Sequence, residues 1–455
     1  MGAVSWSSEI DRPEDRHRIM MRRGSLDQSQ ARAVLSAPLT INSVTLPNRI
    51  VMGPMAANSP EPDGRPGDQT VAFFERRARG GVGMIIAGGV NSTRRSYEET
   101  WFRPLLRLET DEFLPEFRKV ADAVHAHDIP LIAEIMPGFG RMGVPGKTRP
   151  IISASPMNVV IPEQNFPNGV IVPGGRSTPV PDEASIAEIE AFEQEMILTA
   201  ERAMRAGWDG VEVAAHMSYF ASSFLSPRTN WRTDRYGGSV ENRARFLVNI
   251  VAGIRRKLGN HFVVGLRIIA NDYMEPSPGP EGFAAIAKKV EEAGIDYVAL
   301  STGCYERMAD SAPMVDGALI DSGDAMIFKK ALSVPVLLQG LHDPMNAARA
   351  IAEGHGDAVM LARQMLADPD YARKATDGDF EKIVRCDRGN YCMRRLVLGM
   401  PIRCKLNPQM GRESRRGAVP PPDRLIKAPI EQAVLAATGS PTLMGIAGKF
   451  VRKSH

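Results

Sequence analysis

Arg267, Gly340 and Arg363 lie in or just after apolar runs, and their residue types suit an anionic ligand. Arg267 interrupts an otherwise apolar run, where a buried guanidinium is costly unless an anion faces it. Arg363 can donate two parallel hydrogen bonds to phosphate oxygens, and Gly340 lets backbone N–H groups approach a ligand closely. These residues favour a site for a phosphorylated molecule, although a salt bridge at a rim would also account for Arg363.

Side chains that can move protons follow two other apolar runs. His216 and Tyr219 come after one of them, and Tyr305 comes after the other. A phenol, with a pKa of about 10, stays protonated at neutral pH and can donate its proton to a developing carbanion. For His216, a structural place at the end of a strand agrees with the sequence as well as a catalytic one does.

The composition excludes several classes of protein. The 455 residues are 43% hydrophobic and 24% charged, with a formal net charge of +3 and 4 cysteines. No basic stripe concentrates the charge, so a nucleic-acid partner is not expected. The sequence has no apolar run of the roughly 18 residues that a membrane span needs, and its start lacks the pattern of a signal peptide. Because the cysteines are too few for a secreted disulfide scaffold, we expect a cytoplasmic protein.

Short apolar runs alternate with longer helical patterns from about residue 35 to residue 370. Such runs are typical of parallel strands that are covered on both faces. Eight strand-and-helix units predict an α/β fold, a (β/α)₈ TIM barrel. A doubly wound sheet is the alternative, but no Gly-x-Gly-x-x-Gly turn follows the first strand. The expected strands are 49–52, 83–86, 130–135, 210–213, 262–268, 297–301, 335–338 and 358–361.

We expect four parts along the chain. Residues 1–34 are polar and without clear periodicity, and we expect a mobile or loosely docked N-terminal arm. Residues 35–375 hold the barrel, 376–410 form a cysteine-containing segment, and 411–455 form a tail docked on the barrel or on another subunit. The long connection 136–182, rich in Gly and Pro, is expected to form a lid or binding loop at the C-terminal rim of the barrel.

An ordered set of segments resembles the Old Yellow Enzyme, or NADH:flavin oxidoreductase, superfamily over roughly residues 35–410. The most specific segments are 224–230 (FLSPRTN) and 232–239 (RTDRYGGS), followed by 241–246. The opening 46–55 is similar to the first strand of the family. The cysteine-containing segment is similar to that of the 2,4-dienoyl-CoA reductase and trimethylamine dehydrogenase branches, and the chain as a whole resembles the former. The resemblance implies a TIM barrel that binds FMN.

The resemblance assigns the flavin site residue by residue. Arg267 matches the arginine beside the flavin pyrimidine, where a guanidinium stabilises the anionic reduced ring, and Gly340 and Arg363 match the phosphate site. Glu134 stands where the family usually has glutamine. Because an ionised carboxylate only accepts hydrogen bonds, we expect Glu134 to be protonated or partnered, or else to lower the flavin potential. The positions expected to line the flavin by backbone contact are Pro54, Met55, Ala56 and Gly88.

The catalytic segment departs from the family in part. Tyr219 matches the tyrosine that protonates substrate carbon in the ene-reductases. The two positions that usually hold a carbonyl oxygen are Ala214 and Met217, which cannot do so. His216 is adjacent to the second position, but alternation along a strand would turn it elsewhere. The dienoyl-CoA reductase branch draws a second group from the loop after the sixth strand, and Tyr305 is the candidate for this auxiliary donor.

In the same branch, four cysteines hold a [4Fe–4S] cluster. Cys386, Cys392 and Cys404 stand at three of these positions, and Gly389 stands at the second. A cluster would need a fourth ligand, such as Asp387 or solvent, or would lose an iron. The alternative is a relic segment with free thiols. No dinucleotide-binding half follows in the sequence, so we expect electrons to come directly from NAD(P)H or from a redox partner protein.

The sequence therefore predicts an FMN-dependent oxidoreductase that uses NAD(P)H to reduce an activated C=C bond in a small molecule, an unsaturated thioester or ketone. The alternative is an FMN-dependent amine dehydrogenase or demethylase that passes electrons to a partner. A lyase or isomerase barrel without flavin would leave Arg267 unexplained. Because barrels of this family often assemble, we expect a homo-oligomer.

Overall fold

The computed structural model describes residues 26–57, 59–100, 104–146, 149–415 and 427–451. Eight parallel strands close into a barrel, because β3 pairs with both β4 and β15. This confirms the predicted TIM barrel. In order around the barrel, the strands are β3 (Ile50–Met52), β4 (Met84–Asn91), β6 (Leu131–Met136), β11 (Gly210–Ala215), β12 (Val263–Ile269), β13 (Tyr297–Ser301), β14 (Val336–Gln339) and β15 (Ala358–Leu361).

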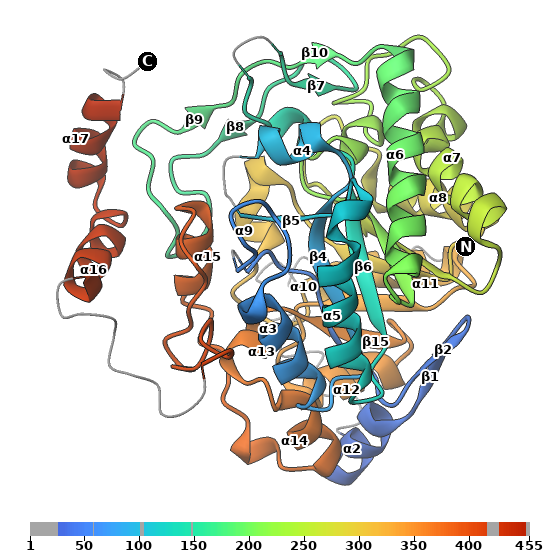
Figure 1. Cartoon of the computed structure of the whole chain (residues 1–455), viewed down its shortest axis with the longest axis vertical. Coiled ribbons are helices and arrows are strands. Elements are labelled where there is room, and N and C mark those ends of the chain that lie inside the picture. The colour runs from blue at the N-terminus through green and yellow to red at the C-terminus, as the bar shows by residue number, and fades with distance from the viewer. Residues whose placement is uncertain (1–25, 58, 101–103, 147–148, 416–426, 452–455) are drawn as a thin grey trace, which may run out of the picture.

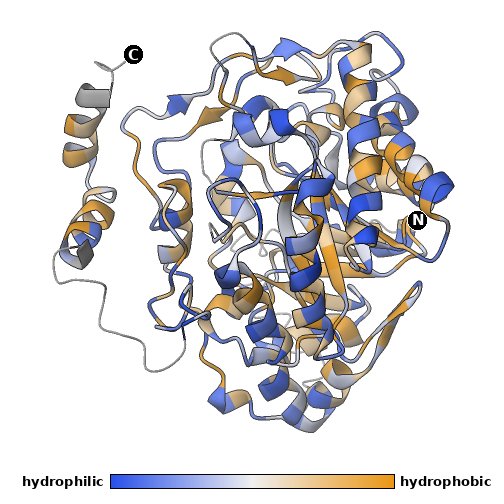
Figure 2. Cartoon of the chain, viewed as in Figure 1, coloured by the Kyte–Doolittle hydropathy of each residue, from blue (hydrophilic) through white to orange (hydrophobic). Residues whose placement is uncertain are grey.

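Helices form a ring outside the strands, as Figure 1 shows. α6 shows why such helices form: Ser185 and Glu188 make a reciprocal capping box at its start, and the buried face includes Met196 and Ala200. The barrel strands are buried along nearly their whole length and are hydrophobic in Figure 2. The covering helices are α3 (Asp68–Ala78), α5 (Leu114–His125), α6 (Ile186–Arg205), α7 (Val240–Leu258), α8 (Gly279–Glu292), α11 (Asp324–Ala331), α12 (Pro344–Ala352) and α13 (Arg363–Ala367).

A hairpin and a helix precede the barrel. The hairpin of β1 (Leu39–Ile41) and β2 (Val44–Leu46) places apolar side chains in one cluster with those of the barrel interior. The helix α2 (Gln28–Ser36) packs on α12, with Ala31 and Leu35 buried. Most of this helix falls within the arm expected over residues 1–34. Asp27 caps it through a capping box, and its buried apolar residues dock it. The rest of the arm, 1–25, lies outside the described residues.

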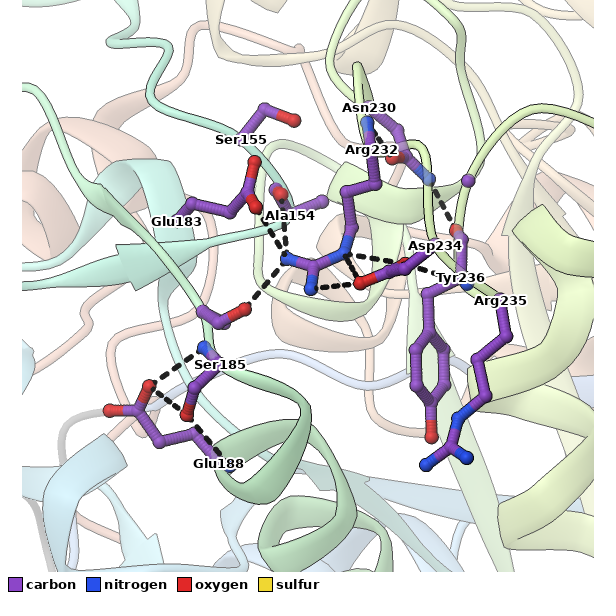
Figure 3. Close-up of polar contacts among 12 residues, drawn as sticks. Ala154, Ser155, Glu183, Ser185, Glu188, Asn230, Arg232, Asp234, Arg235 and Tyr236 are labelled. Carbon is purple, nitrogen blue, oxygen red and sulfur yellow. Dashed lines mark hydrogen bonds and ion pairs between the residues drawn. The ribbon is translucent and has the colours of Figure 1, made fainter.

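The long connection after β6 is folded down onto the barrel rather than left as an open loop. It holds η2 (Gly140–Met142), β7 (Ile152–Ser153), β8 (Val160–Ile161) and β9 (Arg176–Ser177), and ends at β10 (Asp182–Glu183), which pairs with β7. The guanidinium of Arg232 holds this connection in place by hydrogen bonds, as Figure 3 shows. That side chain donates to the carbonyl oxygens of Ala154 and Ala184 and to the carboxylate of Asp234 at 3.2, 2.7 and 2.6 Å. The segment 232–239 therefore has a structural role.

Beyond α14 (Tyr371–Asp377), which follows the last barrel unit, the described chain forms the helices α15 (Tyr391–Val397), α16 (Lys427–Ala437) and α17 (Pro441–Val451). The segment before α16 is tied to α3 by a buried ion pair of 2.6 Å between Arg77 and Glu413. In Figure 1, α16 and α17 lie beside the body of the molecule. No helix in the described ranges is long and apolar enough to cross a membrane. Residues 416–426 and 452–455 of the expected tail lie outside the described residues.

The remaining elements connect those above. They are α4 (Arg94–Glu99), β5 (Leu106–Arg107), η1 (Asp111–Phe113), η3 (Ala221–Phe224), η4 (Tyr305–Arg307), α9 (Met308–Ser311), α10 (Ala318–Asp321), α14 (Tyr371–Asp377) and η5 (Phe380–Lys382).

Candidate active site

A cavity of about 230 Å³ opens at the C-terminal ends of the barrel strands. It gathers residues that are far apart in the sequence, as expected for the catalytic face of a TIM barrel. Of the residues that the sequence singled out, the cavity is lined by Pro54, Met55, Ala56, Glu134, His216, Tyr219, Arg267, Tyr305, Gly340 and Arg363. Gly88 lines a small adjoining pocket instead. A Cβ atom at Gly88 would collide with the side chains of Glu134 and Pro54, so this wall requires glycine.

One side of the cavity holds a buried cluster of charges. Nε2 of His216 lies 3.1 Å from Oε1 of Glu134, and Nη1 of Arg267 lies 3.6 Å from the same oxygen. Burial opposes ionisation of Glu134, but its hydrogen bond to His216 and the nearby charges outweigh burial, so its pKa lies below the ordinary value. Burial and the charge of Arg267 lower the pKa of His216. His216 is therefore neutral and donates its Nε2 proton to the carboxylate.

The position of His216 differs from the one expected from strand alternation. β11 ends at Ala215, and Met217 has a positive φ of 58°, so the period of two stops before His216. The side chain consequently lines the cavity rather than turning away from it. Glu134 is partnered, which is one of the outcomes expected for a carboxylate at this position.

Two tyrosines meet over the cavity. The hydroxyl oxygens of Tyr219 and Tyr305 are 2.9 Å apart, within hydrogen-bond distance. Burial raises the pKa of Tyr305 to about 12, and burial together with the neighbouring phenol raises the pKa of Tyr219 well above its ordinary value. Both phenols are therefore protonated at neutral pH. The ring of Tyr219 is further held edge-on by Phe139 and His216, with centroids 5.4 and 5.6 Å away.

The opposite end of the cavity has cationic side chains. Gly340 has a φ of +88°, which favours glycine, and the space where its Cβ would stand is open. The guanidinium of Arg363 donates to Oδ1 of Asn390 at 2.8 Å, and among the described residues it has no acidic partner within salt-bridge distance. The guanidinium of Arg388 donates to the carbonyl oxygen of Gly340 at 3.2 Å and pairs with Asp316. The rim salt bridge considered for Arg363 is thus not observed in the described chain.

These residues fit FMN. Nε of Arg267 is buried and has no hydrogen-bond partner within the described ranges, so an anionic or carbonyl-bearing ring edge can take it. At the other end, Nδ1 of His342 is also buried without a partner among the described residues. Together with Arg363 and the open backbone at Gly340, it suits a phosphate. Sequence reasoning missed His342 and Arg388, because only the packing of the cysteine-containing segment brings Arg388 to Gly340.

The rest of the cavity wall is apolar. α15, which contains Cys392, contributes Met393, Leu396 and Val397 to it. No periodicity of the sequence pointed to this helix as part of the site. The barrel side of the same wall consists of Leu105, Met136, Phe139, Ala214 and Met217. A ligand beside the tyrosines therefore meets a largely hydrophobic surface.

The cysteines form no metal centre in the described part of the chain. All 4 cysteines are free thiols, and no group of three or more His, Cys, Asp or Glu side chains among the described residues is arranged to hold a metal ion. Burial raises the pKa of Cys392 to about 12 and raises that of Cys386 as well. Iron–sulfur ligation uses thiolates, so a cluster at these positions would require both thiols to lose their protons.

The comparison with known families agrees with this site. The sequence pattern of the NADH:flavin oxidoreductase / NADH oxidase family matches residues 34–381, which include the barrel and nearly all of the cavity. The chain belongs to this family.

Members of this flavin oxidoreductase family match the chain over different shares of their length. The NADH oxidase of Thermoanaerobacter brockii is 31% identical over 424 residues, 91% of this chain and 61% of that protein. The NADPH dehydrogenase of Bacillus subtilis is 29% identical over 360 residues, 75% of this chain and 94% of that protein. A 2-naphthoyl-CoA reductase structure superimposes with a TM-score of 0.75 at 28% identity, over 85% of this chain and 58% of that one. The chain thus spans less than two thirds of the NADH oxidase.

Proposed function

We propose that the chain is an FMN-dependent oxidoreductase that uses NAD(P)H to reduce a C=C bond conjugated to a carbonyl group, in a ketone or a thioester. The pair of protonated phenols at 2.9 Å over the cavity carries this proposal, because reduction of such a bond requires a proton donor beside the hydride donor. The names of the relatives, an NADH oxidase, an NADPH dehydrogenase and a CoA-thioester reductase, support it. Four free thiols suit a reducing compartment such as the cytoplasm.

The residues at both ends of the cavity bind and orient the cofactor. FMN, when bound, supplies hydride transfer between the nicotinamide and the substrate. Arg363 would donate hydrogen bonds to the FMN phosphate, and Gly340 would leave room for it. Arg267 would supply a positive charge to the pyrimidine part of the flavin. Glu134 offsets part of that charge and, held by His216, offers an acceptor to a ring N–H.

Tyr219 donates the proton to the carbon next to the substrate carbonyl group. Its O–H bond breaks as the new C–H bond forms, and the oxygen is left with negative charge. Tyr305 then donates its own O–H to that oxygen, and this hydrogen bond to a charged acceptor stabilises it. Because the surrounding wall is apolar, this hydrogen bond acts in surroundings of low polarity, where it is stronger than in water.

Oxidation of an N-methylated amine is a second candidate, and one observation favours it. Ala214 and Met217 both line the cavity, and neither can hold a carbonyl oxygen by hydrogen bonding. An amine substrate requires no such group.

A stopped-flow experiment with the FMN-loaded protein distinguishes the two. The flavin is first reduced anaerobically with NADPH and then mixed with cinnamoyl-CoA or cyclohex-2-en-1-one. We expect reoxidation by an alkene at a rate that falls about 100-fold or more in Tyr219→Phe, with no change in reduction by NADPH. Reduction of the oxidised flavin by sarcosine, with no reoxidation by either alkene, would instead establish the amine reaction.

A further inference from the structure

A buried polar cluster lies behind the two tyrosines and takes no part in the reaction described above. Its members are Arg141 in η2 after β6, Ser218 and Arg228 after β11, and Glu306 in η4 after β13. The side chains of Arg141 and Glu306 are 3% and 6% exposed. The cluster therefore joins three of the segments that form the rim of the cavity.

The carboxylate of Glu306 is the centre of this cluster. Its Oε1 lies 2.5 Å from Nη2 of Arg141 and 3.3 Å from Nη2 of Arg228. Its Oε2 accepts a hydrogen bond of 3.1 Å from the hydroxyl of Ser218. Burial opposes ionisation of Glu306, but the charges of Arg141 and Arg228 outweigh burial, so its pKa lies below the ordinary value. An ionised carboxylate therefore lies between the buried guanidinium of Arg141 and the partly buried guanidinium of Arg228.

Both partners of the tyrosine pair are covalent neighbours of this cluster. Ser218 precedes Tyr219, and Glu306 follows Tyr305. The hydroxyl oxygen of Ser218 also accepts a hydrogen bond of 3.3 Å from the backbone N–H of Tyr305. Ser218 therefore links the backbone next to Tyr219 to the backbone N–H of Tyr305 and to the side chain of Glu306. A shift of one loop relative to the other would therefore disturb this link.

We propose that Glu306 and Ser218 are positioning residues that hold Tyr305 against Tyr219, with Arg141 and Arg228 fixing the carboxylate. The role in proton transfer rests on the proposed function, whereas the positioning itself does not. The proposal also assigns a role to Arg141 and to Arg228, which belongs to the segment 224–230. Both bind Glu306, and neither has a part in the reaction proposed above.

Nuclear magnetic resonance of the FMN-loaded protein tests the positioning without a substrate. The 8 tyrosines are labelled with ¹³C at Cζ. The resonances of Tyr219 and Tyr305 are assigned by their loss in Tyr219→Phe and Tyr305→Phe. We expect Glu306→Gln to shift both resonances, and Ser218→Ala, a milder change that keeps the ion pairs, to shift them as well. The matched control is Glu193→Gln, which removes a buried carboxylate bonded to the hydroxyl of Tyr236.

The control should move the resonance of Tyr236 and leave the pair unchanged. Resonances of the pair that stay in place in both Glu306→Gln and Ser218→Ala would overturn the proposal. A general loosening of the fold would move many of the tyrosine resonances, and this result also would overturn it, because the predicted effect is confined to the pair.

Kinetics then test the consequence for catalysis. Glu306→Gln should slow the reoxidation of reduced flavin by cinnamoyl-CoA by about tenfold or more and leave reduction by NADPH unchanged. In the Tyr219→Phe background it should add no further loss, because it acts through the tyrosine pair. An equal loss in both backgrounds would overturn the proposal. Shifted resonances together with full activity of Tyr219→Phe would support the positioning and refute the proposed proton donor.

Discussion

Glu212 gives a prediction whose magnitude follows from the structure. This residue is fully buried on β11, where its strand neighbours are Glu134 and Gly265. Burial, with a further contribution from the charge of Glu134, raises the pKa of Glu212 from 4.5 to about 8. The folded protein therefore keeps a proton on Glu212 up to about pH 8, whereas the unfolded chain loses it near pH 4.5.

Folding consequently takes up a proton between these two pH values. The contribution of Glu212 to the free energy of unfolding falls by about 1.4 kcal/mol per pH unit as the pH rises through this window. Between pH 5 and pH 7 the fall amounts to roughly 2 to 3 kcal/mol. Glu212→Gln resembles the protonated acid in shape and cannot titrate. Its free energy of unfolding, minus that of the wild type, should therefore increase by roughly 2 to 3 kcal/mol over the same interval.

Equilibrium unfolding in urea at pH 5, 6 and 7, followed by circular dichroism, measures this difference. Glu112→Gln is the control, because the side chain of Glu112 is 68% exposed, and its difference from the wild type should not depend on pH. If the difference for Glu212→Gln were also the same at every pH, the folded protein would hold Glu212 ionised, and the reasoning from burial would be wrong.

Three further changes test other parts of the account. Arg363→Ala should weaken FMN binding by about 10- to 100-fold in a fluorescence titration, because charge-assisted hydrogen bonds are lost. The control Arg385→Ala removes an ion pair with Asp343 and should leave FMN binding unchanged. Gly340→Val should abolish FMN retention, since a branched side chain neither adopts this positive φ readily nor leaves the cavity open. Glu413→Ala leaves Arg77 buried without its partner and should cost about 3–5 kcal/mol of unfolding free energy in urea; an unchanged midpoint would contradict the buried pair.

The barrel could be predicted because each strand is a short apolar run followed by an amphipathic helix. The predicted and observed strands agree closely, although β4 extends to Asn91, beyond the expected end. The helix α2 in the polar segment before the barrel was harder to predict, because only a capping box and two buried apolar residues fix it. Such a short helix leaves little periodicity in the sequence.

Most of the predicted site residues line the cavity; the prediction rested on the family resemblance and on residue types at strand ends, where a barrel must bring them together. Contacts between distant loops could not be predicted, because nothing in the sequence places Ser218 beside Glu306 or Arg388 beside Gly340. The same holds for α15, whose apolar residues complete the cavity. Ligation of a cluster by three cysteines stays a prediction, and iron analysis of the purified protein tests it.

The central claim is that this cavity binds FMN and passes electrons to it from a nicotinamide. Its most direct test is an anaerobic absorption spectrum of the protein after incubation with FMN and removal of the excess, recorded before and after addition of NADH or NADPH. The account predicts flavin bands that remain with the protein and bleach when the nicotinamide is added. A protein that retains no FMN, or retains FMN that neither nicotinamide bleaches, would contradict it.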